Sequence, residues 1–205
     1  MQLETRTTAF EVRTDEDNPR RLVGTAVVYR SPSDLGRFVE IIEPGALSRT
    51  LSEGRNIRAL VEHDRRALLA STQAGTLKLT DTDAGLRVEI DVAETSYGKD
   101  LLYLVQRGEI RGMSFAFRVA KGGQKFIPVG ERGATKPTRV ISDLDLFEVT
   151  ATATPAYEAT DIAKRSIDAN DALAEFLGET DGDPDRPNYR AARRRLYESL
   201  APAAA

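Results

Sequence analysis

Short apolar runs of strand type fill most of the first 150 residues, and this pattern limits the fold more than any other feature of the chain. Residues 22–29 form a nearly continuous apolar run, as expected for a strand that is buried on both faces. Residues 86–92 alternate apolar and polar side chains, as in a strand with one buried face, and pair with the run at 76–79 as a predicted hairpin. Further strands are predicted at 38–42, 57–61, 110–119 and 140–153. The chain is therefore predicted to be mainly β.

Two flanking helices are predicted, which makes the fold class α+β with strands dominant. Pro44 is placed to begin a short helix and Gly54 to end it, because proline fits a first helical turn and glycine fits the position after the last. Thr95 or Ser96 can cap a longer helix that runs to residue 107, with Gly108 just beyond its end.

The character of the chain changes after about residue 165, so we predict a strand-rich domain at 1–165 and a helical tail at 166–205. Within the tail region, helices are expected at 162–177 and 187–200. Before it, residues 122–137 contain four glycines and two prolines without an apolar period, which predicts a long loop.

The overall composition narrows the function. The net charge of −3 predicts no binding to nucleic acid, and no apolar run is long enough for a membrane helix. The chain has no cysteine and one histidine, so disulfides, thiol nucleophiles and a zinc site are not expected, and we predict no cofactor. The N-terminus lacks a signal-peptide pattern, and the predicted location is the cytoplasm.

The strand predicted at 110–119 carries the best candidate nucleophile. Alternation along this strand puts Ser114 on a face of small residues, which leaves room for a group to approach the hydroxyl. His63, at the end of the strand at 57–61, is the chain's only imidazole and hence the only histidine base for a serine. The alternative is a serine packed against a barrel wall and an exposed histidine. The opposite face of the strand carries Met113, Phe115, Phe117 and Val119.

A third, orienting acid is also needed, and Glu148 is the first choice because a charge inside a strand-like run requires a partner. A solvent-facing glutamate is the alternative, and Asp64, Asp143 and Asp145 compete for the role.

Two other groups of charged residues are further candidates. Glu40 and Glu43 flank the predicted short helix and either bind substrate or cap that helix. A serine–lysine pair is less favoured, because no lysine lies in an apolar setting that would lower its pKa. The lysines considered are Lys78, Lys99, Lys121 and Lys125.

Several segments, taken together and in order, resemble the prohead serine proteases of tailed phages over roughly residues 5–165. They are EIIEPGAL (40–47), LVEHD (60–64), GTLKL (75–79), GL (85–86), RGEIRGMSFAF (107–117), LFEVT (146–150) and TPAY (154–157). The family's fold is similar to the herpesvirus assemblins, so the resemblance implies a closed β-barrel with a few flanking helices.

The resemblance also implies roles for single residues. His63 matches the histidine of the family's Asn/Glu-His-Asp motif, Ser114 the serine of Gly-Met-Ser-Phe, and Glu148 the acid of Leu-x-Glu-Val-Ser. The departures are Glu62 where Asn is common, and Leu47 and Ala116, where Phe and Gly are frequent.

The implied function is a serine endopeptidase that removes the scaffolding segment of the major capsid protein, and cleaves itself, inside the immature capsid in the host cytoplasm. Its partners would be the capsid protein and its scaffolding segment, and a homo-oligomer is left open. Backbone N–H groups at 122–137 are candidates for the oxyanion donors. The alternatives are a non-catalytic barrel that binds capsid or scaffold protein, or the same protease in a prophage remnant or gene transfer agent.

Overall fold

The computed structural model describes residues 3–8, 12–131, 135–153, 172–174 and 176–177. The chain separates into two compact units, Met1–Ser166 and Ile167–Ala205. In the second unit, residues 172–174 and 176 are helical, and the rest of the helices predicted at 162–177 and 187–200 lies outside the described residues. The first unit holds the three sheets of the fold.

The described part of this unit is dominated by strands. They are β1 (Glu4–Thr8), β2 (Arg13–Thr14), β3 (Arg21–Val28), β4 (Ser33–Asp34), β5 (Val39–Ile42), β6 (Arg58–Val61), β7 (Asp64–Ser71), β8 (Leu77–Thr82), β9 (Gly85–Asp91), β10 (Gly112–Val119), β11 (Gln124–Ile127), β12 (Thr138–Ile141) and β13 (Leu144–Thr152). The helices are α1 (Ser48–Ser52) and α2 (Ser96–Gln106). The mainly β fold class is as predicted.

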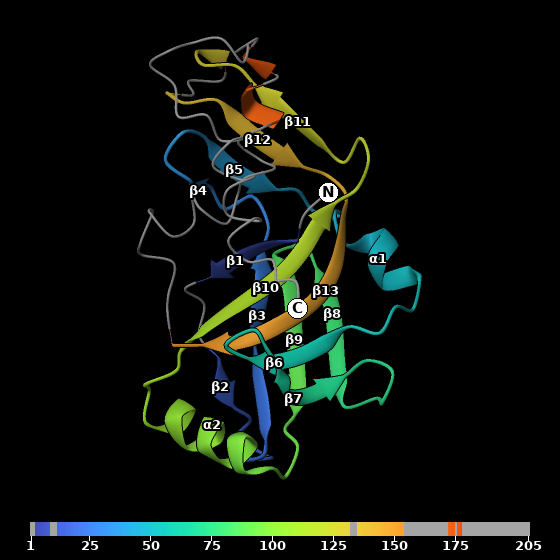
Figure 1. The fold of residues 1–205 in the computed structure, drawn as a ribbon, viewed down its shortest axis with the longest axis vertical. Helices are drawn as coiled ribbons and strands as arrows, with labels where there is room; N and C mark the ends of the chain where they lie inside the picture. Colours follow the sequence, from blue (N-terminus) through green and yellow to red (C-terminus); the bar gives the residue numbers. More distant parts are fainter. Residues whose placement is uncertain (1–2, 9–11, 132–134, 154–171, 175, 178–205) are drawn as a thin grey trace, which may run out of the picture. The chain divides into compact units, whose positions relative to one another are not determined.

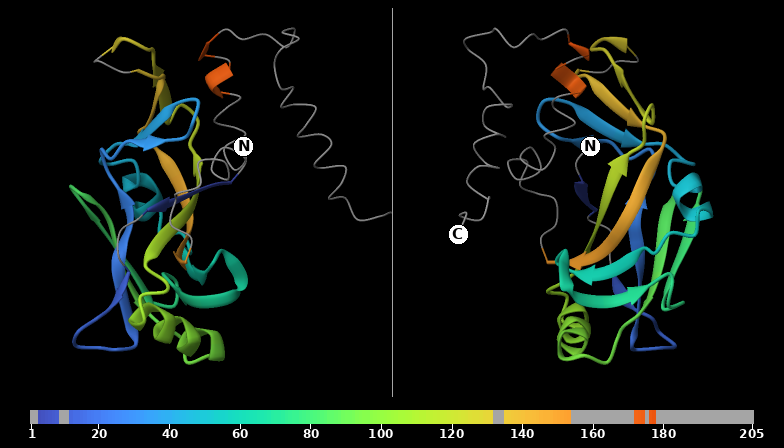
Figure 2. Two further views of the ribbon diagram at one scale, coloured as in Figure 1. Left: turned by 90° about the vertical axis from the view of Figure 1, so that its left-hand side faces the viewer. Right: turned by 45° about the vertical axis from the view of Figure 1, so that its right-hand side comes forward.

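The strands form three sheets (Figure 1). A five-stranded sheet has the order β1-β10-β13-β6-β7, and all its neighbours are antiparallel except β13 and β6, which are parallel. A four-stranded antiparallel sheet has the order β2-β3-β9-β8, and a second four-stranded sheet has the order β11-β12-β5-β4. Figure 2 shows the β6–β7 hairpin beside the long strand β13.

The closed barrel implied by the resemblance is not found among the described residues. The outer strands of the five-stranded sheet, β1 and β7, do not pair with each other. The sheets instead bury their apolar faces between them, with β3 packed against both β1 and β10. Side-chain alternation indicates which face of a strand is buried, but it does not determine which strand edges pair, so closure could not be read from the pattern.

Most predicted elements are present. The hairpin predicted from 76–79 and 86–92 is β8–β9, and the Thr95 hydroxyl accepts a hydrogen bond from the Gly98 N–H at the start of α2, as a helix cap requires. Gly108 follows this helix with a φ of 72°, a backbone conformation that glycine adopts without strain.

Several segments differ from the prediction. Strands β1 and β4 were not predicted, and α1 begins at Ser48, four residues after Pro44. The loop predicted at 122–137 contains β11, which pairs with β12. The strand predicted at 140–153 is split into β12 and β13, because the N–H groups of Ser142 and Asp143 both turn to the Gly123 carbonyl. Strand β7 was not predicted: its exposed start is Asp-Arg-Arg, which lacks an apolar alternation.

The main core lies between the five-stranded sheet and the β2-β3-β9-β8 sheet. The four apolar residues predicted to share one face of β10 are all buried in this core, and the rings of Phe115 and Phe117 stack with their centroids 5.2 Å apart. From the other sheet, β3 and β9 contribute Leu22, Val27, Leu86, Val88 and Ile90. Apolar packing therefore sets the orientation of one face of β10. Because side chains alternate along a strand, the side chains of the opposite face, including Ser114, must point the other way.

A buried cluster of four charges joins β1 to two strands of another sheet. Arg6 hydrogen-bonds the Glu40 carboxylate at 2.6 and 2.8 Å and Glu4 at 2.7 Å. Arg139 contacts both carboxylates at 2.7–2.9 Å, and its remaining nitrogen donates to Gln124. The two cations and two anions balance, so each buried charge has the partners that it needs. Glu40, in β5, therefore belongs to a buried cluster of ion pairs. It does not have the substrate-binding or helix-capping role suggested by the sequence.

We predict that Glu4→Gln destabilises the fold by about 3–5 kcal/mol, because it leaves buried arginines without their full complement of charge. Burial alone would raise the pKa of Glu4, but the hydrogen bond from Arg139 and the charge of Arg6 outweigh it and lower the pKa from its usual 4.5. The Glu4 contribution is therefore present above pH 4.5 and lost as the pH falls through the lower pKa of the folded state.

Urea unfolding at neutral and acidic pH measures this contribution. The matched control is Glu94→Gln, which removes an exposed ion pair with Arg20 and should change stability little. Equal effects of the two substitutions at neutral pH would contradict the assignment of the buried cluster as a stabilising element.

Candidate active site

His63 lies in the two-residue turn of the β6–β7 hairpin. Val61 pairs with Asp64, so Glu62 and His63 are the central residues of the turn. Their φ values are 47° and 59°, which match the positive φ that a type I′ hairpin turn requires at both positions. Such a conformation costs about 1–2 kcal/mol per residue other than glycine. Asn-Gly is the usual sequence for this turn, so Glu-His gave no hairpin signal.

The register between β10 and β13 places the other two candidates together. Ser114 lies opposite Thr150, and Ala116 lies opposite Glu148. Because alternate residues of a strand face the same side, all four side chains belong to one face of the sheet. A bulge follows Ala116 in this ladder, so the regular register extends only as far as these residues.

The three predicted site residues form one hydrogen-bonded chain. The distance from His63 Nδ1 to Glu148 Oε1 is 2.6 Å, and from His63 Nε2 to Ser114 Oγ it is 2.8 Å. These distances are within the hydrogen-bond reach that a nucleophile, a base and an orienting acid require. The His63 side chain is 23% exposed and that of Glu148 11%, so the chain of contacts is partly shielded from water.

The acid determines how the imidazole can be protonated. An ionised carboxylate can only accept, so Nδ1–H of a neutral His63 donates to Glu148 and leaves Nε2 as an acceptor toward the Ser114 hydroxyl. This tautomer is the one that can remove the serine proton. The arrangement can therefore perform nucleophilic catalysis by a hydroxyl.

The Ser114 hydroxyl has a second acceptor, the Arg6 carbonyl oxygen of β1 at 2.8 Å. Since a hydroxyl has one proton, His63 Nε2 and this carbonyl compete for it. Ser114 is only 1% exposed, which differs from the open face of small residues expected from sequence. The small side chains are present, but neighbouring strands and His63 fill the space around the hydroxyl.

The competing acids are in other environments. Asp64 is exposed, and hydrogen bonds from the Arg66 backbone and guanidinium lower its pKa. Asp143 and Asp145 both accept hydrogen bonds from Arg49. None of these contacts involves His63.

The remaining candidates are also separate from this chain of contacts. The N–H of Ala46 donates to the backbone carbonyl of Glu43 in the turn before α1, and Lys78 is an exposed lysine paired with Glu89. Residues 124–127 of the segment proposed for oxyanion binding belong to the β11-β12-β5-β4 sheet, so its oxyanion role stays a prediction.

Sequence reasoning missed the groups that hold the histidine turn. The His63 N–H donates to the Thr150 hydroxyl at 3.1 Å, and this hydroxyl donates to the Leu60 carbonyl at 2.8 Å. The Glu62 carboxylate accepts from the Thr152 hydroxyl at 2.7 Å. The one clue in the sequence was the spacing of these threonines. Thr150 and Thr152 follow Glu148 at intervals of two residues, so on a strand they lie on the same face as the acid.

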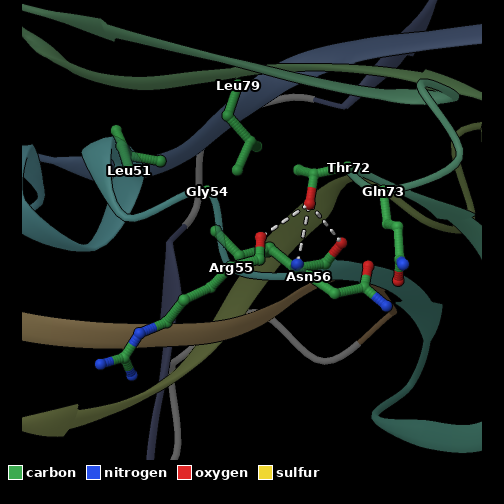
Figure 3. Close-up of a pocket in the computed structure, with 8 residues that line it drawn as sticks. Leu51, Gly54, Arg55, Asn56, Thr72, Gln73 and Leu79 are labelled. Atoms are coloured by element: carbon green, nitrogen blue, oxygen red, sulfur yellow. Dashed lines mark hydrogen bonds between the residues drawn. The ribbon is translucent and has the colours of Figure 1, made fainter.

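A cavity of about 470 Å³ lies elsewhere in the unit, near the end of α1 (Figure 3). The hydroxyl of Thr72 in its wall is already hydrogen-bonded to the Ile57 N–H and the Arg55 carbonyl. The cavity is lined by Leu51, Gly54, Arg55, Asn56, Ile57, Thr72, Gln73 and Leu79. It therefore contains none of the three site residues.

No group of three or more histidine, cysteine, aspartate or glutamate side chains in the described ranges could hold a metal ion. No helix in that same part of the chain is long and apolar enough to cross a membrane.

Comparison with known proteins identifies the family of this chain. The family model of the caudovirus prohead serine proteases matches residues 8–172, which is most of the 205-residue chain. The chain belongs to this family. Family membership makes it a serine protease of bacteriophage capsid maturation. The resemblance seen in the sequence motifs is thereby confirmed, and the match reaches slightly beyond the boundary predicted at residue 165.

Other comparisons add little to the family assignment. The solved structure of the bacteriophage T4 capsid assembly protease, gp21, is similar to this prohead protease with a TM-score of 0.49 and 10% sequence identity. The alignment covers 76% of this chain and 100% of the T4 chain. No curated protein matches the sequence.

Proposed function

We propose that this chain is the endopeptidase that removes the scaffolding segment of the major capsid protein during prohead maturation, and that it also cleaves itself. The observation that supports the chemistry is the Glu148–His63–Ser114 hydrogen-bond chain, with contacts of 2.6 and 2.8 Å. Membership of the prohead serine protease family supports the biological setting. The proposed site of action is the interior of the immature capsid, in the host cytoplasm.

In the proposed mechanism Ser114 is the nucleophile. His63 Nε2 takes the hydroxyl proton as Oγ attacks the scissile carbonyl, and returns it to the leaving amine. Glu148 holds Nδ1–H and stabilises the imidazolium that forms. Attack first requires the hydroxyl proton to point to Nε2 and away from the Arg6 carbonyl, which is a rotation about one bond.

Co-expression with the major capsid protein tests the proposal. We expect the capsid protein to lose one segment, identified by intact mass, with wild-type protease and with the control Ser142→Ala, which changes an exposed serine. Binding of uncleaved capsid protein would instead support the non-catalytic alternative. Cleavage of the protease without cleavage of the capsid protein would contradict the proposed substrate.

We also propose that the tail from about residue 166 onward is dispensable for the protease unit and serves in incorporation into the capsid or in self-cleavage. The first compact unit ends at Ser166, and two short helices of the kind predicted for the tail, joined by a polar segment, are too small to form a core of their own. Truncation after Lys164 should leave the melting temperature and peptide cleavage unchanged while reducing recovery of protease in immature capsids. A truncated protein that does not fold would show that the tail belongs to the catalytic domain.

A further inference from the structure

One face of β13 contacts the histidine turn at three successive positions. Glu148 accepts from the imidazole, Thr150 accepts from the His63 backbone N–H, and Thr152 donates to the Glu62 carboxylate. The three residues are spaced by two, so the strand geometry itself presents them to the same side. The acid and the two turn contacts are therefore supplied by one rigid element.

The middle contact is the most restrictive. Thr150 is 0% exposed, and its hydroxyl bridges the His63 N–H and the Leu60 carbonyl at 3.1 and 2.8 Å. Without this hydroxyl the His63 N–H and the Leu60 carbonyl would each lose a hydrogen bond. The loss would fall on a turn whose two central residues already have an unfavourable positive φ. The bridge fixes the backbone of His63, whereas Glu148 and Ser114 fix only its ring.

The turn is held at a second point, on its other central residue. The Glu62 carboxylate accepts from the Thr152 hydroxyl at 2.7 Å and from the Ala153 N–H at 2.5 Å. The Glu62 N–H in turn donates to the Ala151 carbonyl of β13. Both residues with positive φ are thus bound to the same strand, one through a carboxylate and one through a threonine hydroxyl.

From these contacts we infer that Thr150 and Glu62 are positioning residues for His63. They hold the backbone of the turn so that one imidazole reaches both Glu148 and Ser114. The inference deepens the proposed function and rests on it for its catalytic consequence. The geometric part, that the two residues fix the His63 ring, can be tested without any proteolysis.

The single histidine provides a direct measurement of the ring. In protein labelled with ¹⁵N and purified without a polyhistidine tag, every imidazole signal belongs to His63. Wild type should show the Nδ1–H tautomer with a proton protected by Glu148. Thr150→Val, which keeps the shape and removes the hydroxyl, should broaden or lose this signal, and Thr150→Ser, which keeps the hydroxyl, should restore it.

Labelling by a fluorophosphonate measures the catalytic consequence and requires no knowledge of the cleavage site. Thr150→Val should lower the maximal rate of Ser114 labelling about 10- to 100-fold, the effect of a misplaced base, with the probe's binding constant little changed. Thr150→Ser should recover most of the rate. Glu62→Gln, a milder change at an exposed residue, should alter the same imidazole signal and lower the rate by a smaller factor.

Thr50→Val is the matched control. Thr50 is also 0% exposed, and its hydroxyl accepts from the Leu146 N–H of the same strand β13, but it does not contact the histidine turn. It should lower the melting temperature like Thr150→Val and leave the imidazole signal and labelling rate unchanged.

The outcomes separate the inference from the proposed function. An unchanged His63 signal and rate in Thr150→Val, or equal losses in Thr50→Val, would overturn the positioning role. If Thr150→Val does not fold, an unchanged signal in Glu62→Gln overturns it. A wild-type protein that neither cleaves nor labels would refute the proposed function, while the imidazole signals of the variants would still decide the inference.

Discussion

Ser114→Ala and His63→Ala are each expected to abolish cleavage of the capsid protein, with losses on the order of 10⁴- to 10⁶-fold. The reason is that the 2.8 Å contact between His63 Nε2 and Ser114 Oγ joins the nucleophile to the only imidazole of the chain. Members of such a set act as a unit, so the double variant should be little worse than either single variant. Rates of peptide cleavage and fluorophosphonate labelling measure the effect.

The fold should survive both substitutions, which makes loss of activity interpretable. Ser114→Ala removes the hydrogen bond to the Arg6 carbonyl, at a cost of about 1 kcal/mol. His63 is part-exposed, so its removal leaves no closed cavity. Circular dichroism and thermal melting should therefore resemble those of the wild type. Full processing of the capsid protein by Ser114→Ala would refute the assignment of the nucleophile.

Glu148→Gln is expected to lower the rate by on the order of 10² to 10⁴ while preserving the shape of the side chain. A neutral amide can present its N–H₂ to Nδ1 and so favour the opposite tautomer, in which Nε2 carries the proton and cannot accept one from Ser114. It also gives no charge to stabilise the imidazolium. The same ¹⁵N imidazole spectrum should show the tautomer change that accompanies the rate loss.

Variants of the competing acids show whether the choice of Glu148 is right. Asp145→Asn changes a carboxylate that hydrogen-bonds Arg49, and Asp64→Asn changes one that hydrogen-bonds Arg66. Both should cleave at near the wild-type rate. An inactive Asp64→Asn beside a fully active Glu148→Gln would mean that the orienting acid had been misassigned.

The sequence predicted the local structure of β10 well, because a strand with one apolar face has only one way to bury it. It could not predict that β13 lies between β10 and β6, since ladder partners far apart in sequence leave no local trace. That arrangement is what brings residues 63, 114 and 148 together. The order of motifs along the chain, through the family resemblance, supplied what periodicity could not.

The parts of the site that were missed are those defined by backbone geometry. A Glu-His turn with positive φ at both residues has no composition signal, because its stability comes from contacts with Thr150 and Thr152. The second acceptor for Ser114 is a main-chain carbonyl of β1, which any residue type could supply. The buried Glu4–Arg6–Glu40–Arg139 cluster likewise depends on three strands meeting. The sequence singled out only Glu40 among its members, and for a different role.

The central place of β13 in its sheet has a consequence for synthesis of the protein. Strands β10 and β6 are made earlier, but the strand between them, which also carries Glu148, is the last strand of the described unit to leave the ribosome. Until then the histidine hairpin has no strand on which to dock, and the serine strand lacks one neighbour. Under the proposed mechanism a nascent chain lacks its orienting acid until β13 is made, so proteolytic competence would begin only when the domain is complete.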